Sequence, residues 1–209
     1  NVKGAYFHTY FYCDRKGYSG WSEIAESVFD PASLDLEDAS RYFDEKLSSP
    51  YLLTGISKYL QPAFIPDLPE TFVFFPMQVP DDKVLDLSYV SQSEILQELT
   101  QNPRIAVVIK PHPFAVRDHP QAVEDVRALH NPQGSIFVVD GHLHEIIRRS
   151  TAVICTNSGA GVEALLLGKP VITCGKSDYH HLTTVVKDKA EIWPAIASAK
   201  GASDDLMKK

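Results

Sequence analysis

From residue 71 onward, short apolar runs alternate with amphipathic segments, and this alternation restricts the possible folds more than any other feature. The runs are rich in Val, Ile, Phe and Thr and are too short for buried helices, which is typical of strands covered on both faces. They lie at residues 71–78, 105–110, 135–140, 151–156 and 170–175. Segments with helical spacing lie between them, at 91–101, 120–130, 143–150 and 159–168. The alternation predicts a doubly wound, Rossmann-like α/β fold with a parallel sheet and right-handed crossovers.

The first 70 residues have a different character, with many aromatic and acidic side chains. The chain opens with a strand-like stretch, Ser22 precedes a segment that resembles a capped helix start, and residues 32–49 carry an acidic helical pattern. Prolines at 62, 66 and 69 break helix and central strand alike, which indicates a linker or surface crossing. We therefore expect an N-terminal segment (1–70), a Rossmann-like domain (71–200) and a frayed tail (201–209).

Composition excludes several classes of protein. Twenty Lys and Arg against 27 Asp and Glu give a net charge of −7, which argues against a large nucleic-acid footprint. The sequence lacks the roughly 20 consecutive apolar residues of a membrane span. Three cysteines without CxxC spacing indicate a reducing compartment. The chain starts at Asn1 without a signal-peptide pattern, so we expect a cytoplasmic domain that begins inside a longer parent protein.

Ligands of open parallel sheets lie beyond the carboxyl ends of the strands, and a glycine-rich turn follows the run at 151–156. Asn157, Ser158, Gly159 and Gly161 lie where a helix starts, so backbone N–H groups there could receive a phosphate and Ser158 could add a hydroxyl donor. The alternative is a capped helix whose glycines serve only tight packing. The turn has neither the GxGxxG nor the GKS/T pattern, so neither a dinucleotide fingerprint nor a P-loop is predicted.

A second candidate follows the run at 105–110. His112 lies between two prolines, one of them Pro113, which fixes its backbone and aims the imidazole at the crevice, where it could donate to a phosphate oxygen. Lys110 beside it is either part of the same anion site or a solvated charge at a strand end. Glu163, early in the helix after the glycine turn, either suits the positive helix end or bonds a ribose hydroxyl.

These motifs together resemble a known family. The sequence is similar to the nucleotide-binding half of a GT-B glycosyltransferase in three motifs. They are Lys110-Pro111-His112-Pro113, Thr156-Asn157-Ser158-Gly159 and Gly168-Lys169-Pro170-Val171. More narrowly, the run at 72–82 with the His-Pro motif and the downstream serine resembles bacterial capsule polysaccharide biosynthesis proteins. That group includes the CMP-Kdo-dependent β-Kdo transferases of capsule and lipopolysaccharide assembly. The resemblance covers roughly residues 71–182.

The resemblance implies a donor, partners and site residues. The donor would be a CMP-activated sugar, CMP-Kdo, with His112 and Ser158 on the phosphate of CMP and Gln78 lining the same crevice. Hydrogen-bond donors that are fixed in this way stabilise a departing phosphate. The CMP-sugar is itself a substrate, so no cofactor is expected. Expected partners are a glycan or glycolipid acceptor at the inner membrane and other capsule-assembly proteins, without nucleic acid. The family's acceptor-side domain is absent or represented only by residues 1–70.

Glycosyl transfer also calls for a carboxylate near the anomeric carbon, as a base or a nucleophile. Our candidate is Asp14, which follows an apolar run and precedes a glycine-rich turn; the alternative is an aspartate that caps that turn. Tyr18 and Trp21 could stack on a sugar or pack on each other. Asp81 and Asp82, after Pro80, are expected to start a helix.

Histidine and cysteine spacing does not favour other chemistry. The pairs His142 and His144, and His180 and His181, lack the i, i+4 spacing of a helical zinc site, so no metal is predicted, although the second pair could contact substrate. Cysteines within the apolar runs are expected to be inert. Two other functions stay open: a UDP-sugar-dependent GT-B transferase or 2-epimerase, and a non-catalytic module of a capsule-assembly protein.

Overall fold

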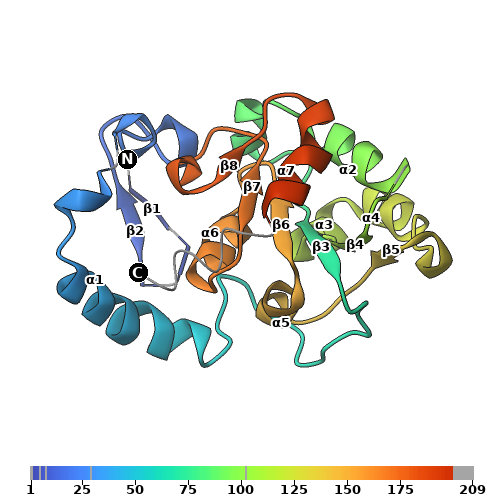
Figure 1. Ribbon diagram of the computed structural model, residues 1–209, viewed down its shortest axis with the longest axis horizontal. Coiled ribbons are helices and arrows are strands. Elements are labelled where there is room, and N and C mark those ends of the chain that lie inside the picture. Colours follow the sequence, from blue (N-terminus) through green and yellow to red (C-terminus); the bar gives the residue numbers. More distant parts are fainter. Residues whose placement is uncertain (1, 5, 8, 29, 102, 200–209) are drawn as a thin grey trace.

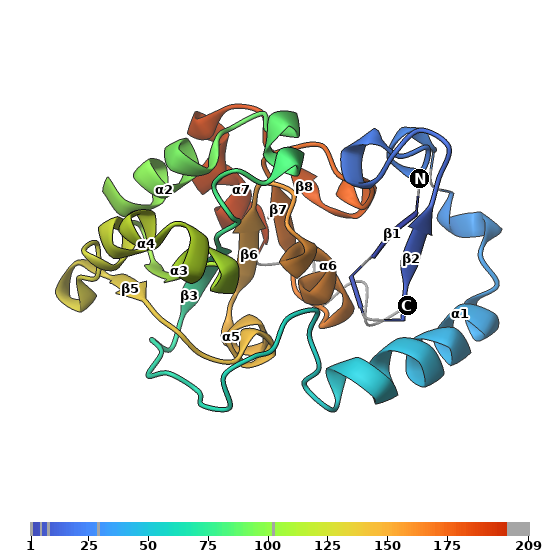
Figure 2. The same cartoon turned by 180° about the vertical axis from the view of Figure 1, so that it is seen from behind.

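The computed structural model describes residues 2–4, 6–7, 9–28, 30–101 and 103–199. The tail predicted at 201–209 lies outside the described residues. In the described part, a parallel sheet with helices on both faces makes up the α/β region, and the N-terminal segment lies beside α6 (Gly159–Leu166) (Figures 1 and 2). None of the helices in this part is long and apolar enough to cross a membrane.

Six parallel strands form the sheet of the described α/β region, in the order β5-β4-β3-β6-β7-β8. Their bounds are β3 (Phe72–Pro76), β4 (Ala106–Lys110), β5 (Ile136–Val138), β6 (Ala152–Cys155), β7 (Val171–Thr173) and β8 (Thr184–Val185). The first five coincide with the predicted apolar runs, while β8 was not predicted. The chain moves outward from β3 to β5 and returns on the other side at β6, so the doubly wound, Rossmann-like prediction is confirmed.

The helices agree with the sequence pattern where their amphipathic period is clear. Four predicted segments form α2 (Gln92–Gln101), α4 (Pro120–Arg127), α5 (Leu143–Arg149) and α6. Two short helices, α3 (Pro113–Asp118) and α7 (Ile192–Ser198), were not predicted. Each is about two turns long, which gives too few residues for a helical period to be distinguished from a loop.

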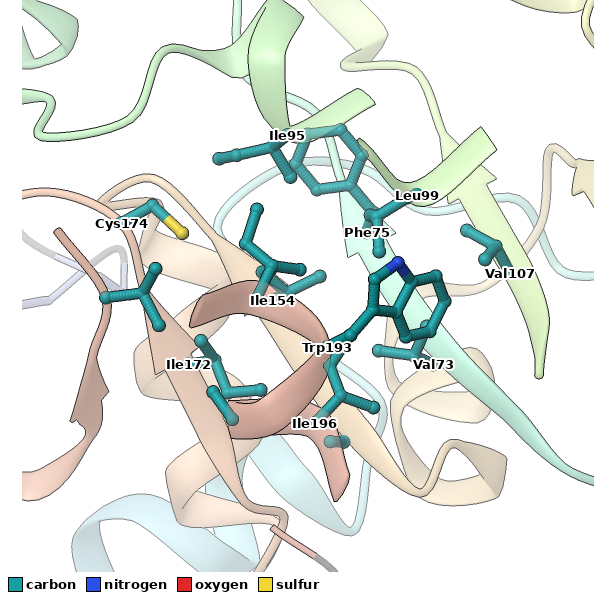
Figure 3. Close-up of a cluster of buried hydrophobic side chains, with 14 of the residues drawn as sticks. Val73, Phe75, Ile95, Leu99, Val107, Ile154, Ile172, Cys174, Trp193 and Ile196 are labelled. Atoms are coloured by element: carbon teal, nitrogen blue, oxygen red, sulfur yellow. The ribbon is translucent and has the colours of Figure 1, made fainter. Parts of the chain in front are cut away.

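The strand residues of β3 show how the core is divided between the two faces of the sheet. Val73 and Phe75 face α2 and α7, where they pack with Ile95, Leu99 and Trp193 (Figure 3). Phe72 and Phe74 face the opposite side, where α5 and α6 contribute Ile146, Ile147 and Ala164. Because both faces are covered, β3 reads as a continuous apolar run, and burial of each such side chain contributes about 1.5–3 kcal/mol.

The N-terminal segment begins with two short antiparallel strands, β1 (Val2–Gly4) and β2 (Phe11–Cys13), in place of one continuous strand. The helix expected after Ser22 is wrong. Ser22 Oγ accepts from the Ala25 N–H, but the segment forms only the single 3-10 turn Ile24–Glu26, because Ser27 is extended (φ −71°, ψ 152°).

The second helical prediction in the segment, at 32–49, is confirmed with a shift of a few residues. Helix α1 (Leu36–Tyr42) is capped by Asp35 and continues in π-helical form over Phe43–Leu52. Residues 56–71, described throughout, then run to β3 without helix or strand, as the prolines predict. The division of the chain at residue 70 stays a prediction.

Candidate functional site

A cavity opens at the carboxyl edge of the sheet where the strand order reverses, between the ends of β3, β4 and β6. Its empty volume is about 720 Å³, including the open mouth. Loops that follow neighbouring strands run in opposite directions from such a switch point and leave a crevice. Seven of the residues selected from the sequence line it: Gln78, Lys110, His112, Pro113, Ser158, Gly159 and Glu163.

His112 enters the cavity wall as the N-cap of α3. Its Nδ1 atom accepts a hydrogen bond from the Phe114 backbone N–H at 3.1 Å, so the neutral ring carries its proton on Nε2. The ring also meets the edge of Tyr59, with centroids 4.9 Å apart. Burial lowers the pKa of His112 to about 4, against a smaller opposing effect of Asp82. At neutral pH the imidazole is therefore an uncharged N–H donor.

Ser158 occupies the corresponding place at the start of α6. Its Oγ accepts from the Ala160 N–H at 3.2 Å, which is the N-cap geometry, and its carbonyl oxygen accepts from the Tyr179 hydroxyl at 2.5 Å. A Cβ on Gly161 would lie 2.5 Å from that hydroxyl oxygen, so Gly161 is needed for packing against Tyr179. A Cβ on Gly159 would lie 3.2 Å from the ring of Tyr6 at the cavity wall.

Lys110 ends β4 and is only 6% exposed. Its side chain thus lies in the walls of two cavities, rather than at an open end of the strand. No described residue accepts a hydrogen bond from its ammonium group or forms an ion pair with it. Burial lowers its pKa, and the charge of Asp140 opposes this effect.

Gln78 and Asn157 join the loops around the cavity through their amides. Gln78 Nε2 donates to Asn157 Oδ1 at 3.1 Å, and the Asn157 backbone N–H donates to Gln78 Oε1 at 3.2 Å. Asn157 Nδ2 also donates to the carbonyl oxygens of Val84 and Lys176. Asn157 was selected as a nucleotide contact, but it lies outside the described lining of the cavity. Its side chain instead holds the loops after β3, β6 and β7 together.

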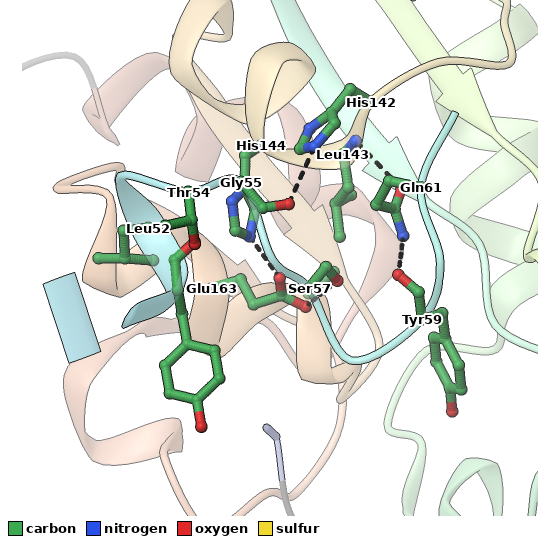
Figure 4. A network of polar contacts seen from close by, with 12 residues as sticks. Leu52, Thr54, Gly55, Ser57, Tyr59, Gln61, His142, Leu143, His144 and Glu163 are labelled. Carbon is green, nitrogen blue, oxygen red and sulfur yellow. Dashed lines mark hydrogen bonds and ion pairs between the residues drawn. The ribbon is translucent and has the colours of Figure 1, made fainter. Parts of the chain in front are cut away.

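Glu163 lies in the cavity wall and belongs to a buried polar network (Figure 4). Ser57 Oγ donates to its Oε1 at 3.0 Å, and His144 Nε2 lies 2.6 Å from its Oε2. His142, beside it, contacts the Gly55 carbonyl oxygen at 3.0 Å. His142 thus fastens the N-terminal segment to the start of α5, Ser57 fastens it to α6, and His144 joins α5 to α6. Within the described residues, the structure shows no group of three or more His, Cys, Asp or Glu that could hold a metal ion.

The sequence analysis missed the residues that the N-terminal segment contributes to the cavity. Tyr6, Lys58, Tyr59 and Gln61 all line it. Tyr59 contacts both His112 and Phe114 edge-on, the latter with centroids 4.8 Å apart. The richness of the segment in aromatic residues was the available signal, but nothing in the sequence pattern indicates which of them reach the sheet edge.

Asp82, also in the lining, caps a 3-10 helix, Lys83–Leu87, by accepting from the Val84 N–H at 3.3 Å, and so starts a helical turn as expected. His180 and His181 lie in a 3-10 helix, His180–Leu182, outside the described lining. The Cys155 and Cys174 thiols are buried, and burial raises the pKa of both, in agreement with inert thiols.

Asp14, selected as the catalytic carboxylate, also lies outside the described lining of the cavity. Its Oδ1 accepts from the N–H groups of Lys16 (2.8 Å) and Gly17 (3.0 Å), and its Oδ2 accepts from that of Glu23 (2.9 Å). These bonds, Gly17 first, lower the pKa of Asp14. The side chain caps its own turn, which was the alternative interpretation.

Tyr18 and Trp21 belong to the same turn region and pack on each other. Their rings meet edge to face with centroids 5.4 Å apart. This is the packing alternative to the sugar-stacking role considered from the sequence, and both residues lie outside the described lining of the cavity.

Comparisons with known proteins give one family match and several relatives. Residues 62–201 match the model of a family described as capsule polysaccharide biosynthesis protein. Protein FixF of Sinorhizobium fredii is 30% identical over 153 residues, which are 68% of this chain and 36% of FixF. The chain thus spans about a third of this curated relative.

Among solved structures, the chain resembles two of Thermosulfurimonas dismutans KpsC. The β-Kdo 2,4 transferase has a TM-score of 0.52 and 19% identity, with 85% of this chain and 60% of that one covered. The β-Kdo 2,7 transferase has a TM-score of 0.49 and 23% identity, with 79% and 50% covered. At these identities the likeness concerns the fold.

Proposed function

The chain belongs to the family of capsule polysaccharide biosynthesis proteins, and on this premise we propose that its cavity binds the phosphate of a CMP-activated sugar for glycosyl transfer. One observation carries the proposal: the imidazole of His112 and the serine-capped start of α6 line the same cavity at the switch point of the sheet. The KpsC structure with the same fold is named a β-Kdo transferase, so Kdo is the sugar that we propose.

Two kinds of N–H donor support phosphate binding. The Phe114 N–H occupies Nδ1 of His112, which leaves Nε2–H as the ring's donor. Helix α6 adds the Gly159 amide at its first position and the positive end of its dipole, beside Ser158. The structure fixes these donors before any ligand arrives, so they would stabilise the negative charge that grows on the phosphate as the sugar departs.

In this proposal Gln78 and Glu163 complete the nucleotide-facing wall. Both carry hydrogen bonds that hold them in place, Gln78 with Asn157 and Glu163 with Ser57 and His144. A ribose hydroxyl could reach a remaining lone pair of the Glu163 carboxylate, because each carboxylate oxygen accepts more than one hydrogen bond. The proposed partners are the nucleotide sugar and a glycan or glycolipid acceptor.

Ligand-dependent stability tests the nucleotide. We expect CMP to raise the free energy of unfolding by about 2.7 kcal/mol at a concentration of 100 times its dissociation constant. A thermal-shift series with CMP, UDP, GDP and ADP measures this on the wild-type chain. A preference for UDP would support a UDP-sugar transferase or 2-epimerase instead, and indifference to all four nucleotides would exclude the proposal.

Variants then locate the site. His112→Ala removes the imidazole donor and is expected to weaken CMP binding about tenfold or more, since hydrogen bonds to charged groups contribute about 1.5–3 kcal/mol. His181→Ala is the matched control, because His181 is exposed and lies outside the described lining of the cavity. Equal CMP affinity of both variants, measured by calorimetry, would contradict the assignment of His112.

A second function, donor binding without catalysis, is favoured by the placement of the carboxylates. Asp14 caps a turn away from the described lining, and the two carboxylates in that lining, Asp82 and Glu163, already accept structural hydrogen bonds. Retained CMP binding with no release of sugar from the donor, in the presence of acceptor glycan, would support this function over transfer.

A further inference from the structure

Residues 55–66, which we call the strap, cross the start of α5 on their way to β3 and carry part of the cavity wall. The strap has neither helix nor strand, and three of its side chains line the cavity, at Lys58, Tyr59 and Gln61. Its large aliphatic and phenyl side chains are exposed, at Ile56, Leu60, Phe64 and Ile65. Burial of these four side chains therefore does not hold the strap in place.

Hydrogen bonds attach the strap to the start of α5 instead. The Leu143 N–H donates to Gln61 Oε1 at 3.2 Å, and the N–H of His142, the N-cap residue, donates to the Phe64 carbonyl oxygen at 3.1 Å. Figure 4 also shows the bond made by a side chain of α5, between His142 Nε2 and the Gly55 carbonyl oxygen at 3.0 Å. A Cβ on Gly55 would lie 3.0 Å from that Nε2, so the ring lies directly against the backbone of the strap.

The acceptor of His142 fixes the protonation state of its ring. A carbonyl oxygen only accepts hydrogen bonds, so Nε2 carries the proton and donates. Nδ1 of the neutral ring is then an acceptor, and it is buried without a hydrogen-bond partner among the described residues. Protonation of the ring would place a second N–H at this buried atom. Such a donor is costly, because it loses its hydrogen bond with water and gains none from the protein.

The charged groups around His142 do not compensate a positive ring. Burial, the largest effect, lowers the pKa of His142, and the charges of His144 and Arg148 act in the same direction. The bonded carbonyl oxygen of the strap and the charge of Glu145 oppose them. Glu163, the nearby carboxylate of α6, contacts His144 Nε2 instead. The position of the strap against α5 therefore requires the neutral form of His142.

We propose that His142 is an acid-sensitive latch, whose neutral ring holds the strap at the cavity and whose protonation releases this wall. In the released state the ring lies in water, where its pKa is about 6.5. The released state then binds more protons than the latched state below about pH 6.5, so release becomes more favourable as the pH falls through this window. The latch stands on the contacts of the strap, while its effect on a nucleotide rests on the function proposed above.

The Leu143 amide reports the latch, because it donates to Gln61 of the strap. Hydrogen exchange measured by NMR, corrected for the intrinsic rate at each pH, gives the opening equilibrium of this bond. A ring that is protonated only in the released state shifts that equilibrium by up to about tenfold between about pH 7.5 and about pH 5.5. We expect exchange at Leu143 to accelerate at least about threefold, without acceleration in β4. His112, whose pKa is about 4, stays neutral at both pH values.

Two substitutions of His142 separate its titration from its hydrogen bond. His142→Gln keeps an N–H donor for the Gly55 carbonyl oxygen but cannot be protonated, so we expect slow exchange at Leu143 at both pH values. His142→Phe removes the donor and the titration, and we expect fast exchange at both. His181→Gln is the matched control, at an exposed histidine outside the described lining of the cavity, and should keep the wild-type response.

CMP binding shows whether the latch controls the cavity. The CMP phosphate itself takes up a proton near roughly pH 6, so the quantity to compare is the dissociation constant of the wild type divided by that of His142→Gln at each pH. The titration of the ligand cancels in this ratio. We expect the ratio to rise at least about threefold between the same two pH values, because Lys58, Tyr59 and Gln61 leave the cavity wall with the strap.

The two proposals fail in different ways. Exchange at Leu143 that does not respond to pH in the wild type, or an acid response that persists in His142→Gln, overturns the latch whether or not CMP binds. A ratio of dissociation constants that stays constant overturns the control of the cavity by the latch. If the wild-type chain does not bind CMP at either pH, the proposed function is overturned, and exchange at Leu143 still decides the latch.

Discussion

His112 combines a fixed tautomer with a depressed basicity, and each has a separate local cause. The Phe114 N–H that donates to Nδ1 selects the tautomer, while burial against Tyr59 and the charges of Lys110 and Lys58 disfavour the imidazolium. A neutral imidazole donates a hydrogen bond to an anion without the desolvation cost of a second charge. The lowered pKa of His112 also makes the free energy of unfolding depend on pH.

Stability should rise with pH because of His112. Its pKa is about 4 in the folded chain and 6.5 in an unfolded one, so the unfolded state binds more protons between these values, and the free energy of unfolding increases as pH rises through this window. His112→Asn keeps a capping acceptor and removes the titration. Urea unfolding at several pH values should show a shallower rise for the variant; an identical rise would contradict the lowered pKa.

For single residues, the sequence identifies candidate site residues well where the residue directly follows a strand. His112 and Ser158 were selected for that reason, and both line the cavity. The sequence cannot indicate partners brought together by the fold, such as Ser57 on Glu163 or Tyr59 on His112, which are 106 and 53 positions apart. The catalytic role of Asp14 stays a prediction, because an apolar run followed by a glycine turn marks both a strand-end site and the capped turn that its side chain forms here.

Helix α6 has two functions that a single residue, Ser158, connects. Its N-cap bond to the Ala160 N–H stabilises the first turn, and the same turn faces the cavity. Helix α1 provides a comparison, because Asp35 caps it in the same way by accepting from the N–H groups of Glu37 and Asp38, but on an exposed part of the N-terminal segment. Capping and ligand binding can therefore be separated by comparing the two helices.

Removing either cap should cost stability, but only one should affect the ligand. Ser158→Ala and Asp35→Ala are each expected to lower the free energy of unfolding by about 1 kcal/mol. Only Ser158→Ala is expected to weaken CMP binding as well, by several-fold, because the helix start then loses a hydroxyl and some of its order. Urea unfolding and calorimetry measure the two effects. Equal CMP affinities for the two variants would separate α6 from the phosphate site.

Prediction of whole elements followed the strength of the local pattern. The strands β3 to β7 and the amphipathic helices were identified because buried parallel strands and one-sided helices have distinct periods. Helix α7 was not predicted because it is short and apolar at most positions. Helix α3 was not predicted because its sequence starts in a Pro-His-Pro motif that indicates a turn. The expected helix after Ser22 is a 3-10 turn, since a capping serine alone does not commit the following residues to continue a helix.

On the scale of the whole molecule, the N-terminal segment serves as a wall of the cavity and is attached to the α/β region by polar contacts. Tyr6 donates to Asp178 Oδ1 at 2.5 Å and Tyr12 donates to Asp178 Oδ2, so one carboxylate in the loop after β7 holds the β1–β2 region. Ser57 and Gly55 attach the other end of the segment through Glu163 and His142. A segment predicted from its composition to be separate thus shapes the candidate site.

The attachment at Asp178 can be removed without touching the sheet. Asp178→Ala deprives the Tyr6 and Tyr12 hydroxyls of their acceptor, and each such loss costs about 1–3 kcal/mol. We expect hydrogen exchange to accelerate at least tenfold in β2 while the amides of β3 and β4 keep their protection, and we expect CMP affinity to fall because Tyr6 lines the cavity. Asp188→Ala, which removes only a surface cap at the Ala190 N–H, is the matched control.

The pattern of exchange in Asp178→Ala also tests whether the chain divides at residue 70. Faster exchange confined to the N-terminal segment would mean that residues 71–199 form a cooperative unit of their own, since local opening reports the boundaries of such units. Equal acceleration in β2, β3 and β4 would mean that the segment and the sheet unfold together. In that case the cavity wall would be part of a single folding unit, and the predicted boundary would be wrong.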